Sequence, residues 1–244
     1  MAGHNKWSKV KNVKGKEDAR KAKIFTKMAR MIMVAVREGG PDPDYNSSLK
    51  MAIEKAKAEN MPGDNIERAI KKGAGELGDA VFTEITYEGY GPEGIAVIVE
   101  CLTDNKNRTA SNVRHAFDKN GGNLGTSGSV TFQFDYKAIL VLEEGEYDYD
   151  QVMMDGLDCG AEDITEDNGL YVITGDPASF ADLHEQLQAK GYRFITAQLG
   201  YLPKNTLALT DPDSISRLEK MIDMLEDDDD VQEVYTNWKS DDED

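Results

Sequence analysis

The stretch DARKAKIFTKMARMIMVAVR, residues 18–37, predicts an amphipathic helix with two distinct stripes. One stripe is apolar and recurs at helical spacing, through Phe25, Met28, Ile32 and Val36. The other stripe carries a single sign of charge, through Arg20, Lys23, Lys27, Arg30 and Arg37. Solvated helix faces usually mix both signs, because opposite charges three or four residues apart stabilise a helix. A stripe of one sign therefore indicates contact with a polyanion such as nucleic acid.

The charge of the whole chain divides near residue 73. Residues 1–73 carry 17 basic and nine acidic side chains, whereas residues 74–244 carry 11 basic and 37 acidic ones. Such a division predicts a basic module that binds a polyanion, attached to an acidic body. The alternative is a basic helical domain that packs against the acidic remainder of its own chain.

The first 16 residues add a basic arm to this helix. Gly3 and Gly15 disfavour a helix, so we expect an extended arm that presents Trp7 among lysines. The tryptophan ring could stack on a base while the lysines contact phosphates, or it could anchor the arm on the helical domain. The candidate nucleic-acid-binding residues here are Lys6, Trp7, Lys9, Lys11, Lys14 and Lys16.

Two further helices complete a basic helical domain. The run from Gly39 to Pro43 ends the first helix, and Asn46 or Ser47 can cap a second one that extends to about Asn60. Asp64 and Glu67 resemble a capping box that starts a third helix, which ends at Gly73. The sequence thus predicts a three-helix bundle.

From Phe82 the hydrophobic period changes to that of an α/β protein. Strands are expected at 83–88, 95–102 and 129–134, with a helix at 108–119. Residues 138–201 then give the complete order β-α-β-β-α-β of a ferredoxin-like domain. The elements at 83–134 give only β-β-α-β, which lacks one helix and one strand of a complete two-layer domain. A last helix at 211–225 and a strand at 231–235 supply them, so the ferredoxin-like domain is expected to be inserted into this middle domain.

The expected fold class is α+β with several domains: an N-terminal three-helix domain with a basic arm, then two α/β (ferredoxin-like) domains, one inserted in the other. The predicted division is a basic helical domain at 1–78, a middle domain at 79–135 plus 203–240, an inserted domain at 136–202 and an acidic tail at 241–244.

No stretch carries a catalytic or metal-binding pattern. His4, His115 and His184 lack the spacing of a metal motif, and there is no phosphate-binding loop or nucleophile elbow. Residues 227–230, four aspartates, lack the spaced ligands of a calcium loop and predict a solvated acidic turn. We therefore expect a non-enzyme with no metal, no cofactor and no small-molecule substrate. Cys101 and Cys159 are expected to be reduced and buried.

A second basic stretch, TDNKNRT at 103–109, leads into the helix expected at 108–119. Helix N-termini bind phosphate, and nearby cations would add charge-assisted hydrogen bonds. The candidate residues are Asn105, Lys106, Asn107, Arg108 and Arg114. The alternative is ordinary capping of the helix by Asn105 or Asn107, with Arg108 paired to the acidic body.

The N-terminus has no apolar secretory segment, and no stretch is apolar over about 18 residues, so a cytoplasmic protein without a membrane partner is expected.

Several long motifs resemble the YebC-like family, whose mitochondrial branch includes a translational activator of a cytochrome oxidase subunit. In order along the chain they are GHNKWSKVKNVKGKEDARKAKIFTK, NMPGDNIERAIKKG, YEGYGPEG, LTDNKNRT and GGNLGTSGSV. The resemblance implies three domains and a cytoplasmic, non-enzymatic protein of gene expression. Bacterial members are usually described as probable DNA-binding transcriptional regulators, whereas the mitochondrial branch and some bacterial members act in translation. Gly63 stands where the family often has lysine.

These observations predict a nucleic-acid-binding regulator of gene expression, of the DNA-binding type by resemblance. One alternative is a ribosome-associated translation factor that binds rRNA or tRNA. Its basic head and acidic body suit the charge division better, because an acidic body of net charge −26 would be repelled by a long duplex. Another is a protein-interaction module. The oligomeric state cannot be derived from the sequence.

Overall fold

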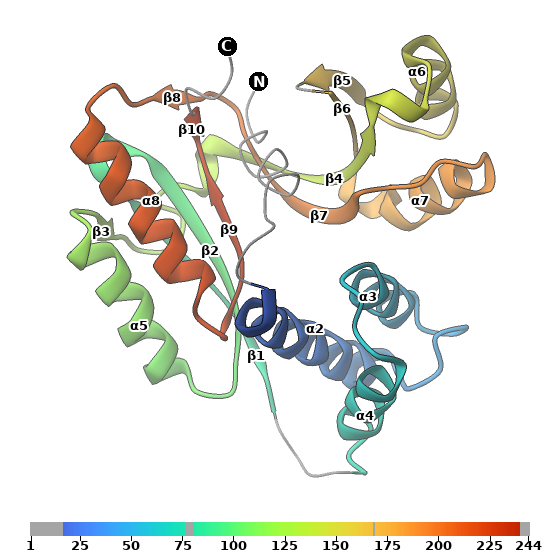
Figure 1. Cartoon of the computed structure of the whole chain (residues 1–244), viewed down its shortest axis with the longest axis horizontal. Helices are drawn as coiled ribbons and strands as arrows, with labels where there is room; N and C mark the ends of the chain where they lie inside the picture. The colour runs from blue at the N-terminus through green and yellow to red at the C-terminus, as the bar shows by residue number, and fades with distance from the viewer. Residues whose placement is uncertain (1–16, 77–80, 168, 240–244) are drawn as a thin grey trace. The chain divides into compact units, whose positions relative to one another are not determined.

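The computed structural model describes residues 17–76, 81–167 and 169–239 (Figure 1). The basic arm expected at 3–16 and the acidic tail at 241–244 lie outside these residues. The described residues form two compact units, of which one contains residues up to 131 together with 209–236. The other contains residues 132–208 together with those from 237 on.

The first unit begins with the predicted three-helix bundle. Its helices are α2 (Glu17–Gly39), α3 (Ser47–Ala58) and α4 (Gly63–Gly73). The apolar stripe of α2 faces their common core, where Ile32 and Leu49 are fully buried. Because α3 and α4, with 12 and 11 residues, are too short to be stable alone, they depend on this core shared with α2.

Asn46 connects the first two helices of the bundle. Its side-chain oxygen accepts a hydrogen bond from the Leu49 N–H at 3.0 Å and so caps α3, as one of the two predicted candidates. Its amide nitrogen donates to the main-chain oxygens of Ala35 and Gly40, at 2.7 and 2.8 Å. The buried side chain thus satisfies the C-terminal end of α2 and the start of α3 together.

The predicted capping box of α4 is wrong. The residue before the helix is Pro62, whose ring has no polar atom to cap the helix, and Asp64 lies inside the first turn. The Glu67 carboxylate accepts instead from Lys71 at 2.6 Å, one turn further along the helix. An i,i+4 ion pair on the exposed face therefore uses the group that the capping box would need.

The same unit contains a four-stranded antiparallel sheet in the order β3-β1-β2-β9. The strands are β1 (Thr83–Tyr90), β2 (Ala96–Thr103), β3 (Asn123–Leu124) and β9 (Val231–Thr236). Helices α5 (Lys106–Lys119) and α8 (Pro212–Glu226) cover one face (Figure 1). The central strand β2 is buried except at Glu100, as expected for a strand with neighbours on both sides. The last helix and strand thus complete the interrupted block, as predicted.

The strand expected at 129–134 is absent there; the third strand of the sheet is β3, at Asn123–Leu124, and residues 131–133 form a 3₁₀ turn. The cause is the buried carboxylate of Glu88. It accepts hydrogen bonds from the N–H groups of Gly128, Val130 and Thr131, at 2.7, 2.9 and 2.9 Å. In a strand, these N–H groups would bond to the main-chain oxygens of a neighbouring strand. Here the Glu88 side chain accepts their hydrogen bonds instead, so no strand forms.

The second unit is the predicted ferredoxin-like domain. Its elements are β4 (Phe134–Glu143), α6 (Tyr149–Asp158), β5 (Asp163–Asp167), β6 (Leu170–Gly175), α7 (Phe180–Ala189) and β7 (Thr196–Pro203). They form an antiparallel sheet in the order β5-β6-β4-β7, which is the order of the split β-α-β fold. Two short strands, β8 (Leu207–Ala208) and β10 (Trp238–Lys239), pair in parallel.

The architecture confirms the expected α+β class with one domain inserted into another. The helical bundle and the first sheet share one compact unit, so their separation into two domains stays a prediction. Both cysteines are free and buried. In the part of the chain that the structure describes, no helix has the length and apolar character to cross a membrane.

We predict that Glu88→Gln destabilises the first unit by about 1–3 kcal/mol, because an amide replaces one of the two acceptor oxygens by an NH₂ donor that opposes at least one of the three N–H groups. Burial alone would raise the pKa of Glu88, but these hydrogen bonds hold it below its ordinary value of 4.5. A pKa lowered by folding stabilises the protein above the unfolded pKa, and that contribution is lost as the pH falls through the folded pKa. Urea unfolding at pH 7 and at lower pH measures the effect.

The cost of Glu88→Gln should therefore shrink on acidification. Glu84→Gln, at an exposed position of the same strand, is the control and should leave stability nearly unchanged. Equal stability of the Glu88→Gln variant and the wild type at pH 7 would contradict the role given to this carboxylate.

Candidate nucleic-acid interface

The cations of the α2 stripe contact a single acidic segment. We call residues 226–230, which run from the last residue of α8 to the start of β9, the acidic turn. We call Lys23, Lys27 and Arg30 the α2 cationic face. Lys23 Nζ lies 2.9 Å from Asp227 Oδ1, and Lys27 Nζ donates to the main-chain oxygen of Glu226 at 2.7 Å. Arg30 also donates to residues of this turn, so each cation of the face has an intramolecular partner.

Arg30 makes the innermost contacts of the face. Its Nη1 lies 2.7 Å from Asp230 Oδ1, 2.5 Å from the main-chain oxygen of Asp229 and 3.2 Å from that of Leu102. The side chain is only 13% exposed and the Asp230 side chain 2%. The contacts therefore pass from a solvent-exposed pair at Lys23 to a buried pair at Arg30, and buried pairs are screened much less by salt.

Asp230 also binds the start of α5. Arg108 donates to both carboxylate oxygens, with Nη2 at 2.7 Å from each and Nε at 3.0 Å from Oδ2. The Thr109 hydroxyl donates to Oδ2 at 2.8 Å. Burial alone would raise the pKa of Asp230, but the hydrogen bonds from Arg108, Thr109 and Arg30 hold it below its ordinary value. The carboxylate is therefore charged at neutral pH and shared by two guanidinium groups.

Lys27 lies deeper than a solvated lysine. Burial lowers its pKa, and the negative charges of Glu233, Glu226, Asp228 and Asp229 partly offset this effect. On α3, Lys55 adds a contact with Glu233 of β9 at 3.1 Å. These contacts support the alternative drawn from the sequence, in which the basic helices pack against the acidic remainder of the chain. Nucleic-acid binding by this face stays a prediction.

The start of α5 is arranged differently. Asn105 caps the helix by accepting from the Arg108 N–H at 3.1 Å, and Arg108 pairs with Asp104 and Asp230, as the alternative interpretation proposed. Lys106, Asn107 and Arg114 are exposed and have no side-chain partner within the described ranges. These three side chains are therefore available to a ligand.

The other candidate residues have side chains that the structure does not describe. Lys6, Trp7, Lys9, Lys11, Lys14 and Lys16 lie outside the described residues, and Arg20 lies in α2 at a position whose side chain is not described. Of the candidates that are described, the structure brings Arg30 and Arg108 together on one carboxylate.

The acidic turn corrects a prediction from the sequence. Asp230 is buried and not solvated, although Asp227 and Asp229 are more exposed. Asp228 shapes the turn, since its carboxylate accepts from the Asp230 N–H at 2.8 Å and from Asn112 at 2.7 Å. One feature of the sequence indicated the burial of Asp230: it directly precedes Val231, the first apolar residue of strand β9. Across the described ranges, no cluster of side chains could hold a metal ion.

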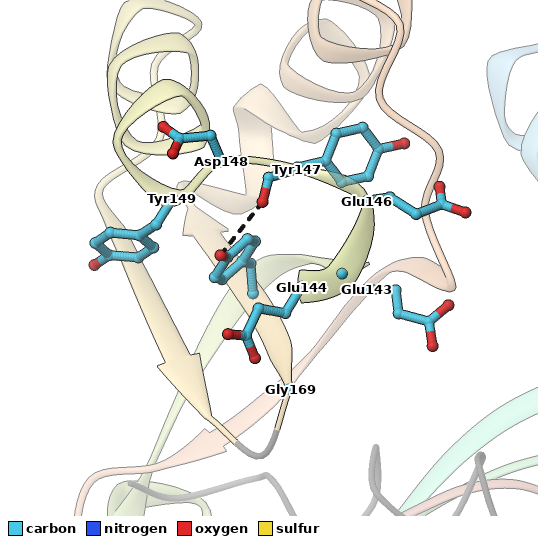
Figure 2. Close-up of a pocket in the computed structure, with 9 residues that line it drawn as sticks. Glu143, Glu144, Glu146, Tyr147, Asp148, Tyr149 and Gly169 are labelled. Atoms are coloured by element: carbon cyan, nitrogen blue, oxygen red, sulfur yellow. Dashed lines mark hydrogen bonds between the residues drawn. The ribbon is translucent and has the colours of Figure 1, made fainter.

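The second unit has a cavity of about 650 Å³ whose lining is acidic and aromatic (Figure 2). It is lined by Glu143, Glu144, Gly145, Glu146, Tyr147, Asp148, Tyr149, Gly169 and Tyr171. The Tyr171 hydroxyl donates to the main-chain oxygen of Tyr147 at 3.4 Å, and the Tyr149 and Tyr171 rings lie 5.4 Å apart. Four carboxylates without a basic residue repel phosphate, so this cavity is not part of a nucleic-acid interface.

Two family models match the chain, and together they cover most of it. Residues 5–76 match the N-terminal domain of TACO1/YebC proteins, and residues 82–238 match their second and third domains. The chain belongs to the TACO1/YebC family.

Relatives of this YebC-family protein match over nearly their full length. A probable transcriptional regulatory protein from Finegoldia magna is 59% identical over 98% of this chain and 99% of its own. Another of the same description, from Clostridioides difficile, is 56% identical over 93% of this chain and 96% of its own. The crystal structure of a conserved hypothetical protein from Aquifex aeolicus has a TM-score of 0.86 at 42% identity, covering 95% of both chains. The relatives' descriptions indicate a regulator, which points away from an enzyme.

We predict that Asp230→Asn destabilises the first unit by roughly 2–4 kcal/mol, because it leaves two guanidinium groups without their shared charge. The folded pKa of Asp230 is lowered, so its contribution is present above the unfolded pKa and disappears as the pH falls through the folded pKa. Thermal unfolding at pH 7 tests this, with Asp227→Asn at an exposed position as the control. Equal melting temperatures of the two variants would contradict the role of Asp230.

Proposed function

We propose that this protein regulates gene expression by binding nucleic acid through its basic N-terminal region and the start of α5. The observation that carries the proposal is the division of charge, with 17 basic and nine acidic residues before residue 74 and 11 and 37 after it. A region so enriched in cations gains affinity for a phosphate backbone through release of bound counterions. The regulatory descriptions of its relatives agree with this proposal.

Separate groups would contribute in separate ways. The lysines of the arm would contact phosphates and Trp7 would stack on a base. Lys106, in the first turn of α5, and Arg114, about 12 Å further along the helix, would contact separate phosphates. Asn107 is exposed beside them and can donate a hydrogen bond to a phosphate or a base. Arg108 would not contact the ligand itself, because its guanidinium is already paired with Asp104 and Asp230. Its role would be to hold the start of α5 in place.

The relatives' descriptions favour DNA as the ligand, and one structural observation favours RNA. A helix that reads bases has to lie in the major groove with its polar face free. The α2 cationic face instead packs against the acidic turn. A ribosome-associated factor that holds a folded rRNA or tRNA needs no such reading, because the RNA is recognised by its shape. RNA binding is therefore our second candidate.

We predict that Lys106→Glu combined with Arg114→Glu weakens nucleic-acid binding by roughly tenfold or more, because two attractive charges near phosphates become repulsive. For duplex DNA the slope of log affinity against log salt should fall by about 0.9 for each phosphate that is no longer neutralised. The matched control is Arg193→Glu with Lys220→Glu, which changes two exposed cations elsewhere by the same charge. Fluorescence anisotropy measures both, and equal weakening in the two variants would mean that only net charge matters.

Ultraviolet crosslinking of the protein in its own cells, followed by sequencing, distinguishes the two ligands. We expect crosslinks to concentrate on rRNA or tRNA if the second candidate holds. Discrete DNA sites would instead establish the transcriptional form and would require a base-reading element in the helical bundle. Absence of any crosslinked nucleic acid would contradict the proposed function in both forms.

A further inference from the structure

We propose that the acidic turn is an internal competitor of nucleic acid: it occupies the α2 cationic face in the free protein, and a polyanionic ligand displaces it from Lys23 and Lys27 on binding. This inference rests on the proposed function and concerns how the site is regulated. It assigns the α2 cationic face two alternative partners of similar chemistry.

The acidic turn presents acceptors where a phosphate backbone would present them. Lys23, Lys27 and Arg30 are separated by four and three residues, or about 6 and 4.5 Å of helix rise. Along that line they meet the Asp227 carboxylate, the Glu226 carbonyl, the Asp229 carbonyl and the Asp230 carboxylate. Two of these acceptors are charged and two are main-chain oxygens. One nucleic-acid strand likewise offers a row of closely spaced oxygen acceptors, at about one charge per 3.4 Å.

The contacts differ in how easily they can be exchanged. At the outer end, the side chains of Lys23 and Asp227 are 40% and 75% exposed, and exposed pairs contribute little to stability. At the inner end, the side chains of Arg30 and Asp230 are 13% and 2% exposed, and Asp230 is also bound by Arg108. Displacement should therefore begin at Lys23 and proceed toward Lys27, while the pair at Asp230 stays closed.

The turn itself keeps its shape during such an exchange. The contacts of Asp228 with the Asp230 N–H and with Asn112 lie within the sheet-and-helix part of the unit and do not involve α2. A single phosphate would replace only one of the interactions on the α2 cationic face, whereas adjacent phosphates of one strand replace several. The site should thus select polyanions over isolated phosphates, and its apparent affinity is the intrinsic affinity multiplied by the fraction of molecules in the open form.

The first test is the variant Asp227→Asn with Asp229→Asn, which weakens the competitor without touching Asp230. Its matched control is Asp118→Asn with Glu219→Gln, at exposed positions of α5 and α8, which changes the net charge equally. Dissociation constants for bulk tRNA and for a random-sequence DNA duplex are measured at one salt concentration. We expect the turn variant to bind about two- to fivefold more tightly than the control, the effect of removing one exposed ion pair at Asp227 and one nearby negative charge at Asp229.

A second test follows the Lys23–Asp227 pair directly in the unmodified protein. A zero-length carbodiimide reagent couples an amine to a carboxylate that touches it, so it should join Lys23 to Asp227, 2.9 Å apart. Lys137 and Glu162, 2.5 Å apart in the other unit, give an internal reference. We expect bulk tRNA to lower the yield of the Lys23–Asp227 product relative to the reference. Inorganic phosphate at the same total phosphate concentration should not.

The outcomes separate this inference from the function on which it rests. Tighter binding by the turn variant, or a lower yield of the Lys23–Asp227 product with tRNA alone, supports the internal competitor. If the wild type binds tRNA or duplex, but variant and control bind equally and the crosslink yield does not change, the ion pair is a permanent part of the fold. The inference is then wrong and the proposed function stands. If no form of the protein binds either nucleic acid, both are wrong.

Discussion

The buried carboxylate of Asp230 is the interaction on which the first unit depends, because it joins segments that are distant along the chain. Arg30 of α2 lies 200 residues before it, and Arg108 and Thr109 of α5 lie 122 and 121 residues before it. An unpaired buried charge would be strongly destabilising, so this one requires its two guanidinium partners and a hydroxyl. The helical bundle is thereby bound to the sheet through charge, beside the apolar contact that Phe82, directly before β1, makes with the bundle core.

The same charge division that suggests a polyanion as ligand also explains how the chain holds itself together. Phosphates and carboxylates bind the same lysine and arginine groups. A cation that is paired within the chain must therefore give up its partner to bind a phosphate, whereas an unpaired cation can bind one directly. At the α2 cationic face the partner is the acidic turn. At the start of α5, Lys106 and Arg114 are exposed and bind no other described side chain. A basic region is thus divided between a structural role and the positions open to a ligand.

Local pattern predicted the elements well and their chemistry less well. Apolar periodicity located α2 and the inserted β-α-β-β-α-β order, because those signals lie within a few residues of one another. The strand expected at 129–134 failed because Glu88, some 40 residues earlier, binds the N–H groups at 128–131. Likewise, Asp227 and Asp230 belong to the same run of four aspartates, yet only the second is buried. The partner of a side chain is set by tertiary packing, which the local sequence does not contain.

The inserted domain has a fold that can bind RNA, but its surfaces do not favour it. A four-stranded sheet of this type binds RNA when exposed aromatic rings on its open face stack on bases. Ala138 pairs with Gly175, which packs on Leu183 of α7, so Ala138 faces the helices and its neighbour Ile139 faces the opposite side. There Ile139, Val141, Leu170 and Val172 form a buried aliphatic cluster and present no ring. Residues 132–208 also carry 15 acidic and four basic side chains, a charge that repels phosphate. Within the described residues, the proposed affinity for nucleic acid is therefore assigned to the first unit, where intramolecular carboxylates already pair with some of its cations.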